Sequence, residues 1–312
     1  MYFKSALIGY SGFVGSNLSL ENHFDLRYNR ENINEIEDKE IEFVICAGIS
    51  ALKWRANQHP KEDYAKISQL KRHLSKVRVK RFVLISTVDI YDLPLSVNED
   101  DRPNELKQDA YGYNRYQFEK WVMQNENFKN YHIIRLPALF GQGLKKNLIF
   151  DLINPLARLI NISTWDQLSS KYNIEEIDFI LKYYIKTDLG YKLKESLPRA
   201  VQDQLIRMFK TKGFSSLNFT DSRSVFQFYH LKNLFNDINK AISNNWPIYN
   251  LSSEPISADE LVEYVQGSEF NNHTSKGPIQ YNMYSKYADN HQYIYRKATL
   301  LEEIKQYIIG CT

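Results

Sequence analysis

The chain has 312 residues, a net charge of +3 and 43% hydrophobic residues. This length fits one large α/β domain plus a smaller lobe and is sufficient to bury a sizeable core. The small net charge gives no support for a nucleic-acid or anionic-membrane partner. No apolar run approaches the length that spans a bilayer, and no signal peptide precedes the first strand. We therefore expect a soluble protein.

Two cysteines occur, Cys46 in a predicted strand and Cys311 near the C-terminal end. They make neither a disulfide framework nor a metal site. The sequence therefore predicts a reducing compartment, most simply the cytoplasm, and no bound metal.

Three glycines spaced three residues apart follow the apolar run Ala6–Ile8 and lead into a helix-compatible segment. In dinucleotide-binding units, a glycine loop between a first strand and a helix places the nucleotide pyrophosphate at the helix N-terminus. There, free N–H groups and the helix dipole attract the anion. The first glycine permits the tight turn, the second lets the backbone approach the phosphates, and the third allows close packing of helix and strand. The alternative is a tight turn without a ligand. The predicted site comprises Gly9, Gly12, Phe13, Val14 and Gly15.

Asn29 and Arg30 follow the second predicted strand, residues 24–28. An acidic residue at this point of a dinucleotide-binding unit would bind the ribose hydroxyls and repel a 2′-phosphate. Here a guanidinium stands instead, and it can pair with a phosphate in a bidentate manner. The sequence therefore favours NADP(H) over NAD(H). The alternative is that Arg30 begins a solvated turn beside Glu31.

Two further strands end in residues suited to a ligand. The buried strand 41–46 runs into Ala47 and Gly48, whose small size lets the adenine side of a cofactor lie close. The strand 81–87 ends in the hydroxyl residues Ser86 and Thr87. Because ligands of doubly wound sheets bind at the carboxyl ends of strands, Thr87 is placed to meet a substrate.

A polar loop over residues 92–109 precedes a predicted helix that starts near Asp109 and puts Tyr111 and Arg115 on one face, four residues apart. A further buried strand, 132–141, contains Pro137.

Taken in order, these features resemble the extended short-chain dehydrogenase/reductase family, and within it the nucleotide-sugar epimerase, dehydratase and reductase branch. The resemblance covers the first half of the chain in detail. It implies an α/β fold, a Rossmann-like doubly wound parallel sheet with a smaller, mostly helical C-terminal substrate lobe. The features that carry it are the spacing of Gly9, Gly12 and Gly15, the strand ending in Ser86 and Thr87 with Tyr91 after it, the Tyr111–Arg115 helix and the Arg135–Pro137 strand.

The late segments 226–231 and 249–252 fit a return of the chain to the core sheet and are expected to join it. We therefore expect residues 1–143 with 224–252 to form the dinucleotide-binding domain, and residues 144–223 with 253–312 to form the substrate lobe. No repeat or linker separates these parts, so the two lobes are expected to fold together.

The resemblance implies roles for three residues. Tyr111 would be the general acid/base, and Thr87 would hydrogen-bond the same substrate oxygen. A phenol with a reference pKa of about 10 needs nearby positive charge to work as a base. Arg115 stands where the family has lysine, and it would grip the nicotinamide ribose without relaying a proton. The remaining cofactor contacts implied are Asn29, Arg30, Ala47, Gly48, Ser86, Tyr111, Arg115 and Pro137.

Dehydratases of this branch place an Asp-Glu pair after the catalytic threonine, where this chain has Val88 and Asp89. Dehydration is therefore disfavoured, and C4 epimerisation and reduction of a 4-keto sugar both stay open. Asp89 would contact substrate as an additional base or cap the next turn. Arg223, just before the return strand, is a candidate partner for the substrate diphosphate.

The leading hypothesis is an NADP(H)-dependent epimerase or ketoreductase acting on a nucleotide-activated sugar. The competing hypothesis is a non-catalytic dinucleotide-binding relative with a partner-binding or regulatory role. In that case, Arg115 in place of the family's lysine indicates that catalytic activity has been lost. By resemblance we expect a homodimer, and Phe118, Trp121 and Val122 allow pairing through the tyrosine helix. The late tyrosines, among them Tyr281 and Tyr295, either line a sugar pocket or form half-buried surface.

Overall fold

A computed structural model describes residues 2–289 and 292–311 of the chain. The chain divides into two compact units. Unit 1 comprises Met1–Leu144, Val225–Ile256 and Gln280–Glu303, and unit 2 comprises Lys145–Ser224, Ser257–Ile279 and Ile304–Thr312. The assignment of one lobe to the cofactor and the other to the substrate stays a prediction.

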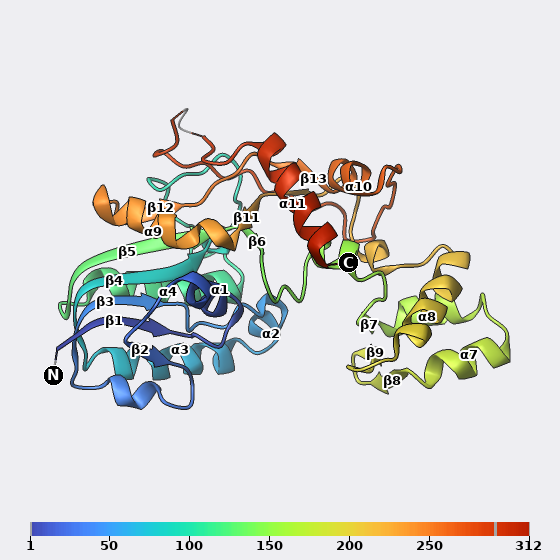
Figure 1. Cartoon of the computed structure of the whole chain (residues 1–312), viewed down its shortest axis with the longest axis horizontal. Helices are drawn as coiled ribbons and strands as arrows, with labels where there is room; N and C mark the ends of the chain where they lie inside the picture. The colour runs from blue at the N-terminus through green and yellow to red at the C-terminus, as the bar shows by residue number, and fades with distance from the viewer. Residues whose placement is uncertain (1, 290–291, 312) are drawn as a thin grey trace. The chain divides into compact units, whose positions relative to one another are not determined.

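A six-stranded parallel sheet forms the centre of unit 1, in the order β12-β5-β4-β3-β1-β2 (Figure 1). The strands are Val-, Ile- and Leu-rich and largely buried, as expected of a parallel sheet that is covered on both faces. The direction of strand progression reverses between β1 and β3, and ligands of open α/β sheets bind beside such a switch point. The predicted Rossmann-like sheet is confirmed. Its strands are β1 (Tyr2–Ile8), β2 (Leu26–Tyr28), β3 (Glu40–Cys46), β4 (Arg78–Thr87), β5 (Phe128–Leu136) and β12 (Ile248–Asn250).

Helices cover both faces of this sheet (Figure 1). On one face Ile67, Leu74 and Phe118 from two helices join the core. On the other face Leu18 and Ile238 do the same. The helices are α1 (Phe13–Glu21), α2 (Lys53–Gln58), α3 (Pro60–Leu74), α4 (Ala110–Gln124) and α9 (Leu234–Ser243). The shorter elements are η1 (Ile33–Ile36), η2 (Val88–Ile90), η4 (Leu231–Asn233), β6 (Ala138–Phe140), β10 (Val225–Phe226), β11 (Phe228–His230) and β13 (Ile256–Ser257).

Two of the three residues expected to allow pairing of subunits lie in the interior of unit 1. Phe118 and Val122 are both 0% exposed and pack in the core beneath α4, while Trp121 is only partly buried. These apolar side chains are therefore explained by the fold of one chain, and they give no support for a dimer.

A buried polar network lies between the sheet and α4. Arg135 on β5 donates to both carboxylate oxygens of Glu119 and, at 2.7 Å, to the Tyr91 hydroxyl. Asn250 on β12 donates to the same hydroxyl, and the Asn250 N–H donates to Glu99. Arg135 and Glu119 are 2% and 0% exposed, so each compensates the buried charge of the other.

Unit 2 contains a three-stranded antiparallel sheet with the order β7-β9-β8. Trp165, Leu168, Ile180, Tyr184 and Phe209 form a separate core between this sheet and its helices. The elements are α5 (Leu148–Ile153), β7 (Leu159–Ile160), α6 (Ile162–Ser169), α7 (Ile174–Leu181), β8 (Tyr184–Thr187), β9 (Gly190–Leu193), α8 (Arg199–Thr211), η3 (Ser216–Phe219) and α10 (Ala258–Gln266). A last helix, α11, covers Lys297–Cys311.

In unit 2 a helical spacing of apolar residues runs across two different elements. Ile177, Leu181, Tyr184 and Ile185 share a helical spacing, which suggests one continuous apolar stripe. The helix ends at Leu181, and Tyr184 and Ile185 belong to β8. Aromatic and β-branched residues in the run 183–185 favour a strand, and this preference outweighs the helical spacing.

No helix among the described residues is long and apolar enough to cross a membrane.

Candidate active site

The glycine loop joins β1 to α1, and two of its glycines are required by packing. Gly9 has a φ of +86°, and a Cβ there would lie 2.4 Å from the Ala47 carbonyl oxygen. A Cβ on Gly15 would lie 2.1 Å from the Gly9 carbonyl oxygen. At Gly12 the nearest atom would be 3.3 Å away, a contact that a small shift relieves. Packing therefore explains why Gly9 and Gly15 must be glycine, but it explains Gly12 only weakly. Gly12 is the position at which a missing side chain would let a ligand approach the backbone.

The N-terminus of α1 follows directly. Gly12 is its N-cap residue and supplies no side-chain cap. The N–H groups of Phe13, Val14 and Gly15 belong to the first turn, where a helix offers them no carbonyl acceptor. These N–H groups and the helix dipole suit a pyrophosphate, so the residues present fit the phosphate part of a dinucleotide.

The end of β2 carries no carboxylate. The Asn29 side-chain oxygen accepts the Glu31 N–H at 2.8 Å, and the Asn29 side-chain amide donates to the Tyr10 hydroxyl at 3.3 Å. Arg30 is exposed and lines a pocket with the basic residues Arg55, His59 and Lys66 and the acidic residues Glu62 and Asp63. Glu62 lies in the same pocket and pairs with Arg55 and Lys66.

The end of β3 lies against the glycine loop. The Ala47 N–H donates to the Ile8 carbonyl at 2.8 Å. A Cβ on Gly48 would come within 3.0 Å of the Ile8 side chain. The small residues at this strand end therefore serve the packing of β3 beside β1.

Tyr111 is placed by the first turn of α4. Asp109 caps this helix by accepting the Gly112 N–H at 2.8 Å, and the Tyr111 N–H donates to the Asn57 side chain at 2.9 Å. A Cβ on Gly112 would lie 2.2 Å from the Asp89 carbonyl oxygen, so only glycine lets α4 pack this closely on the turn after β4. The packing brings Tyr111 close to the Thr87 side chain, which lowers the pKa of the Tyr111 phenol.

Tyr111 is 7% exposed, and burial raises its pKa above the ordinary value of a phenol. The Arg115 guanidinium lowers the pKa but by less, the Asp89 carboxylate raises it, and Thr87 and Lys53 lower it. Burial wins, and the net pKa is raised. Tyr111 therefore carries its proton at neutral pH.

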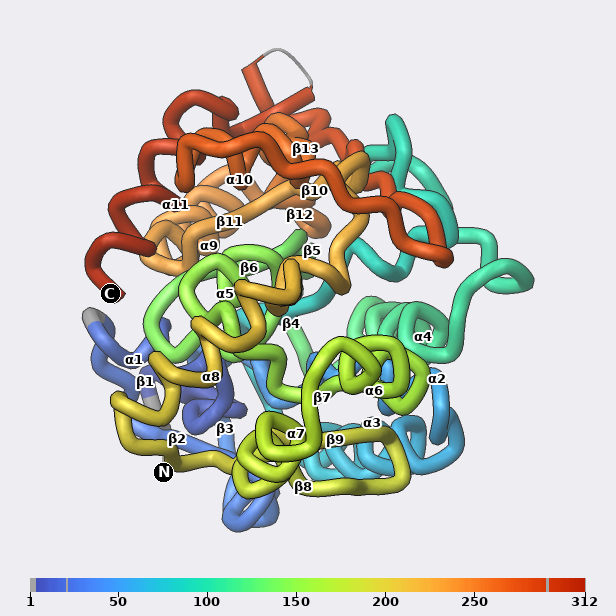
Figure 2. Tube along the Cα trace, turned by 90° about the vertical axis from the view of Figure 1, so that its right-hand side faces the viewer, coloured from blue at the N-terminus to red at the C-terminus, as the bar shows by residue number. Residues whose placement is uncertain are grey.

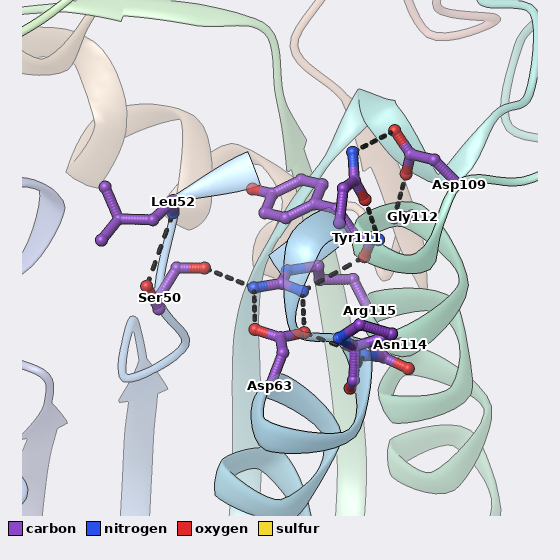
Figure 3. A network of polar contacts seen from close by, with 10 residues as sticks. Ser50, Leu52, Asp63, Asp109, Tyr111, Gly112, Asn114 and Arg115 are labelled. Atoms are coloured by element: carbon purple, nitrogen blue, oxygen red, sulfur yellow. Dashed lines mark hydrogen bonds and ion pairs between the residues drawn. The ribbon is translucent and has the colours of Figure 1, made fainter. Parts of the chain in front are cut away.

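Arg115 lies 3.8 Å from the centre of the Tyr111 ring but is held by another residue (Figure 3). Its two terminal nitrogens donate to the two carboxylate oxygens of Asp63 at 2.5 and 3.0 Å. They also donate to the carbonyls of Tyr111, at 3.2 Å, and Ser50, at 2.6 Å. All four terminal N–H groups are therefore engaged, and the buried Nε has no hydrogen-bond partner among the described residues. Binding of the nicotinamide ribose by Arg115 stays a prediction. It would require Arg115 to exchange some of its present hydrogen bonds for bonds to the ribose.

Asp89 is held by two residues that the sequence did not connect with it. Lys53, at the start of α2, donates to its Oδ1 at 2.9 Å, and the Tyr281 hydroxyl donates to the same oxygen at 2.7 Å. Burial lowers the pKa of Lys53, but the Asp89 and Asp109 carboxylates together raise it more, so Lys53 stays charged. Lys53 is thus a second cation whose field reaches Tyr111.

Most of the remaining late tyrosines are tied into packing. Tyr287 stacks on Trp246 at 4.1 Å, and Tyr295 donates to Asp237. The contact between Tyr281 and Asp89 brings this part of the chain to Thr87 and Tyr111.

Three further predicted site residues have these positions in the fold. Ser86 donates to Glu119 at 2.5 Å and so joins the buried network. Pro137 is half-buried between β5 and β6. Arg223 belongs to unit 2, where its guanidinium pairs with both oxygens of Asp221 at 2.9 Å. No cluster of His, Cys, Asp or Glu in the described part of the chain could hold a metal ion.

The parallel sheet with a glycine loop at its switch point is a Rossmann-like fold, and a buried tyrosine lies close to a threonine at the carboxyl end of β4. Residues 21–174 match the model of the NAD-dependent epimerase/dehydratase family. The resemblance to the extended short-chain dehydrogenase/reductases, in their nucleotide-sugar branch, is thereby confirmed.

The fold is shared with solved structures at low identity. A dTDP-4-dehydrorhamnose reductase from Yersinia enterocolitica is 13% identical with a TM-score of 0.60, over 99% of this chain and 100% of that one. A UDP-glucuronic acid 4-epimerase from Bacillus cereus, solved with NAD, is 14% identical with a TM-score of 0.61, over 100% of both chains. RMD from Pseudomonas aeruginosa, solved with NADPH, is 15% identical with a TM-score of 0.56, over 99% and 97%. No curated protein matches the sequence.

Proposed function

We propose that the protein is an NADP(H)-dependent reductase that acts on the keto group of a nucleotide-activated sugar, with Tyr111 as the general acid. The observation that supports this proposal is the buried Tyr111 phenol, which lies close to Thr87 at the carboxyl end of β4. When bound, the dinucleotide supplies the hydride. Thr87 would orient the substrate oxygen, and Tyr111 would give its proton to that oxygen.

The protonation state of Tyr111 favours reduction over C4 epimerisation. An epimerase must first remove a proton from a sugar hydroxyl, which requires a phenolate. Burial raises the pKa of Tyr111, and Asp63 compensates much of the charge of Arg115, so the phenolate is scarce at neutral pH. Reduction of a ketone needs the protonated phenol, which is the abundant form.

The cofactor preference rests on Arg30. No carboxylate stands at the end of β2. In the pocket that Arg30 lines, Glu62 already pairs with Arg55 and Lys66, so the guanidinium of Arg30 is the group that suits a 2′-phosphate. A fluorescence titration should show tighter binding of NADPH than of NADH, and Arg30→Ala should remove the difference while sparing NADH binding. Equal affinity for both cofactors would contradict this preference.

The proposed reaction is tested by comparing the same substitution at two tyrosines of α4. Tyr111→Phe should abolish reduction of a nucleotide-linked 4-keto sugar and leave NADPH affinity nearly unchanged. Tyr113→Phe, a change on a 40% exposed side chain of the same helix, should leave the rate unchanged. A rate that survives in Tyr111→Phe would overturn the assignment.

A second candidate function follows from the bonds of Arg115. Because all four of its terminal N–H groups are engaged, the protein would bind a dinucleotide without catalysis and serve as a partner-binding or regulatory relative. Arg115→Lys separates the two. If the wild type has no rate and the lysine variant gains one, the protein is a binder; a rate in the wild type supports the reductase.

A further inference from the structure

The backbone N–H of Tyr111 is held by a side chain from another helix. The Asn57 side-chain oxygen, on α2, accepts this N–H at 2.9 Å, although 54 residues separate the two positions in the sequence. Helix α2 lies beside the start of α4 (Figure 2). The first N–H groups of a helix have no acceptor within the helix. Asn57 therefore supplies an acceptor that α4 itself cannot give to its tyrosine.

Asp109 satisfies the neighbouring donors of α4 but not Tyr111. Its Oδ1 accepts the Gly112 N–H at 2.8 Å, and its carbonyl accepts the Tyr113 N–H at 2.9 Å. The side chain of an N-cap residue bonds the N–H of the second or the third helical residue, and here it bonds the third. The start of α4 therefore has a cap in two parts. Asp109 caps Gly112 from within the same segment, and Asn57 caps Tyr111 from α2.

The two parts of this cap are bonded to each other. The Asn57 amide donates to Oδ2 of Asp109 at 3.1 Å, while Oδ1 of Asp109 stays on Gly112. Asn57 therefore uses its side-chain oxygen for Tyr111 and its nitrogen for Asp109, and both ends of the amide have a partner. A displacement of Asn57 would therefore disturb both parts of the cap at once.

The same face of α2 also holds the carboxylate that lies near Tyr111. Lys53 and Asn57 are four residues apart, so they lie on one face of the helix. Lys53 donates to Asp89 at 2.9 Å, and its Nζ lies 3.5 Å from Oδ2 of Asp109. One face of α2 therefore contacts three residues of the candidate site, namely Asp89, Asp109 and Tyr111.

Asn57 itself contributes little packing. It is exposed, and Ala56 is the buried residue of α2. Truncation of an exposed side chain leaves no cavity, so a substitution at Asn57 tests its hydrogen bonds and not the core. Tyr111, by contrast, is 7% exposed and depends on the first turn of α4 for its place. The exposed amide therefore controls the position of a buried phenol.

We propose that Asn57 is a positioning residue for Tyr111, because it fixes the first turn of α4 and with it the place from which the phenol gives its proton. Proton transfer needs the donor within hydrogen-bond reach of the substrate oxygen, and a small misplacement of a catalytic group costs much of the rate. Asn57 acts through the Tyr111 backbone. Its effect on the rate rests on the proposed reductase function, whereas its effect on Tyr111 does not.

The first test removes the amide. Asn57→Ala should lower kcat for reduction of a nucleotide-linked 4-keto sugar roughly tenfold or more and leave KM and NADPH affinity nearly unchanged. The matched control is Gln58→Ala, a truncation at the next exposed position of α2, which should keep the wild-type kcat. A loosened first turn admits water, so the pKa of Tyr111, which burial raises, should fall towards the ordinary phenol value in Asn57→Ala. Carbon NMR of tyrosines labelled at Cζ measures this titration without turnover.

The second test exchanges the amide and the carboxylate of the cap. Asn57→Asp alone removes the amide donor and sets a carboxylate against Asp109, so kcat should fall. When Asp109→Asn is added, the carboxylate at position 57 can accept both the Tyr111 N–H and the new amide, whose oxygen can still cap Gly112. The net charge then equals that of the wild type. The double variant should therefore recover most of the kcat that Asn57→Asp loses, and circular dichroism checks that each variant is folded.

A lower melting temperature with unchanged kcat in Asn57→Ala would overturn the proposal, because Asn57 would then serve only the stability of α4. Equal losses of kcat in Asn57→Ala and Gln58→Ala would overturn it as well, as would a double variant no faster than Asn57→Asp. A wild type without reductase activity contradicts the proposed function instead. The Tyr111 titration then decides, since an unchanged titration in Asn57→Ala excludes the positioning role and a lowered pKa supports it.

Discussion

Asp63 and Arg115, 52 residues apart in the sequence, form a two-pronged ion pair beside the ring of Tyr111. The positive charge that tyrosine-dependent chemistry requires is therefore present, but a carboxylate compensates it. The pair makes Asp63 a positioning residue, because it acts on Tyr111 through Arg115.

Replacing Asp63 with asparagine should lower the pKa of Tyr111. The amide keeps a hydrogen-bond acceptor for Arg115 but removes the negative charge, so the guanidinium acts on the phenol uncompensated. We expect the pKa to fall by roughly one unit. The high-pH limb of the reduction rate should shift to lower pH by the same amount.

A readout without turnover is carbon NMR of tyrosines labelled at Cζ, with Tyr111→Phe identifying the signal. Asp166→Asn, an exposed carboxylate in unit 2, is the control and should leave the Tyr111 titration unchanged. An unchanged titration in Asp63→Asn would contradict the compensating role of Asp63.

Replacing Lys53 with glutamine should shift the same titration in the opposite direction. Lys53 lowers the pKa of Tyr111, and Asp89 would lose its cationic partner while still raising that pKa. The Tyr111 signal should therefore titrate at higher pH than in the wild type. A shift in the same direction as that of Asp63→Asn would show that the two charges do not act through their fields on Tyr111.

Substitutions at Gly15 and Gly12 should affect different properties, because Gly15 is required by packing and Gly12 is placed for ligand binding. Gly15→Ala places a methyl group 2.1 Å from the Gly9 carbonyl oxygen and should lower the melting temperature. Gly12→Ala meets only a 3.3 Å contact and should melt close to the wild type while binding NADPH at least about tenfold more weakly. Thermal melting and NADPH titration of both variants measure this, and unchanged NADPH affinity in Gly12→Ala would argue that the loop is a turn without a ligand.

Asp151 in unit 2 predicts a pH dependence of stability. Burial raises its pKa from 3.8 to about 7, against a smaller opposing effect of Arg158. Its contribution to stability is complete below the unfolded pKa and is lost as the pH rises through the folded value of about 7. Between about pH 5 and pH 8, Asp151→Asn should gain roughly 2 kcal/mol relative to the wild type. Denaturant unfolding at both pH values measures the gain, and a pH-independent difference would contradict it.

Local patterns were sufficient to predict the central sheet and the glycine loop. Buried apolar runs bounded by turn residues are strong signals of parallel strands, and the spacing of Gly9, Gly12 and Gly15 is a signal within seven residues. At the start of α10 a serine is followed three residues later by a glutamate, which is the pattern of a capping box. The Ser257 hydroxyl instead donates to Asp259 and makes no capping bond.

The environment of Tyr111 could not be predicted, because it is made by residues far apart in sequence. Asp63 reaches Arg115 across 52 positions, and Tyr281 reaches Asp89 across 192. Asp63 sits in the first turn of α3, where an acidic residue is ordinary, so nothing local marks it. One local signal was available: Gly112, directly after the tyrosine, is a poor helix former and marked the close approach of α4 to Asp89.

The network around Arg135 has a consequence for the order in which the protein is made. Arg135 and Glu119 emerge early in synthesis, but Asn250 arrives only after the whole of residues 145–224 has been translated. Glu99 also accepts bonds from Ser285 and Lys286, which come later still. A nascent chain that stops before these residues therefore holds polar groups that lack their final partners, so unit 1 reaches its full stability only when nearly the entire chain has left the ribosome.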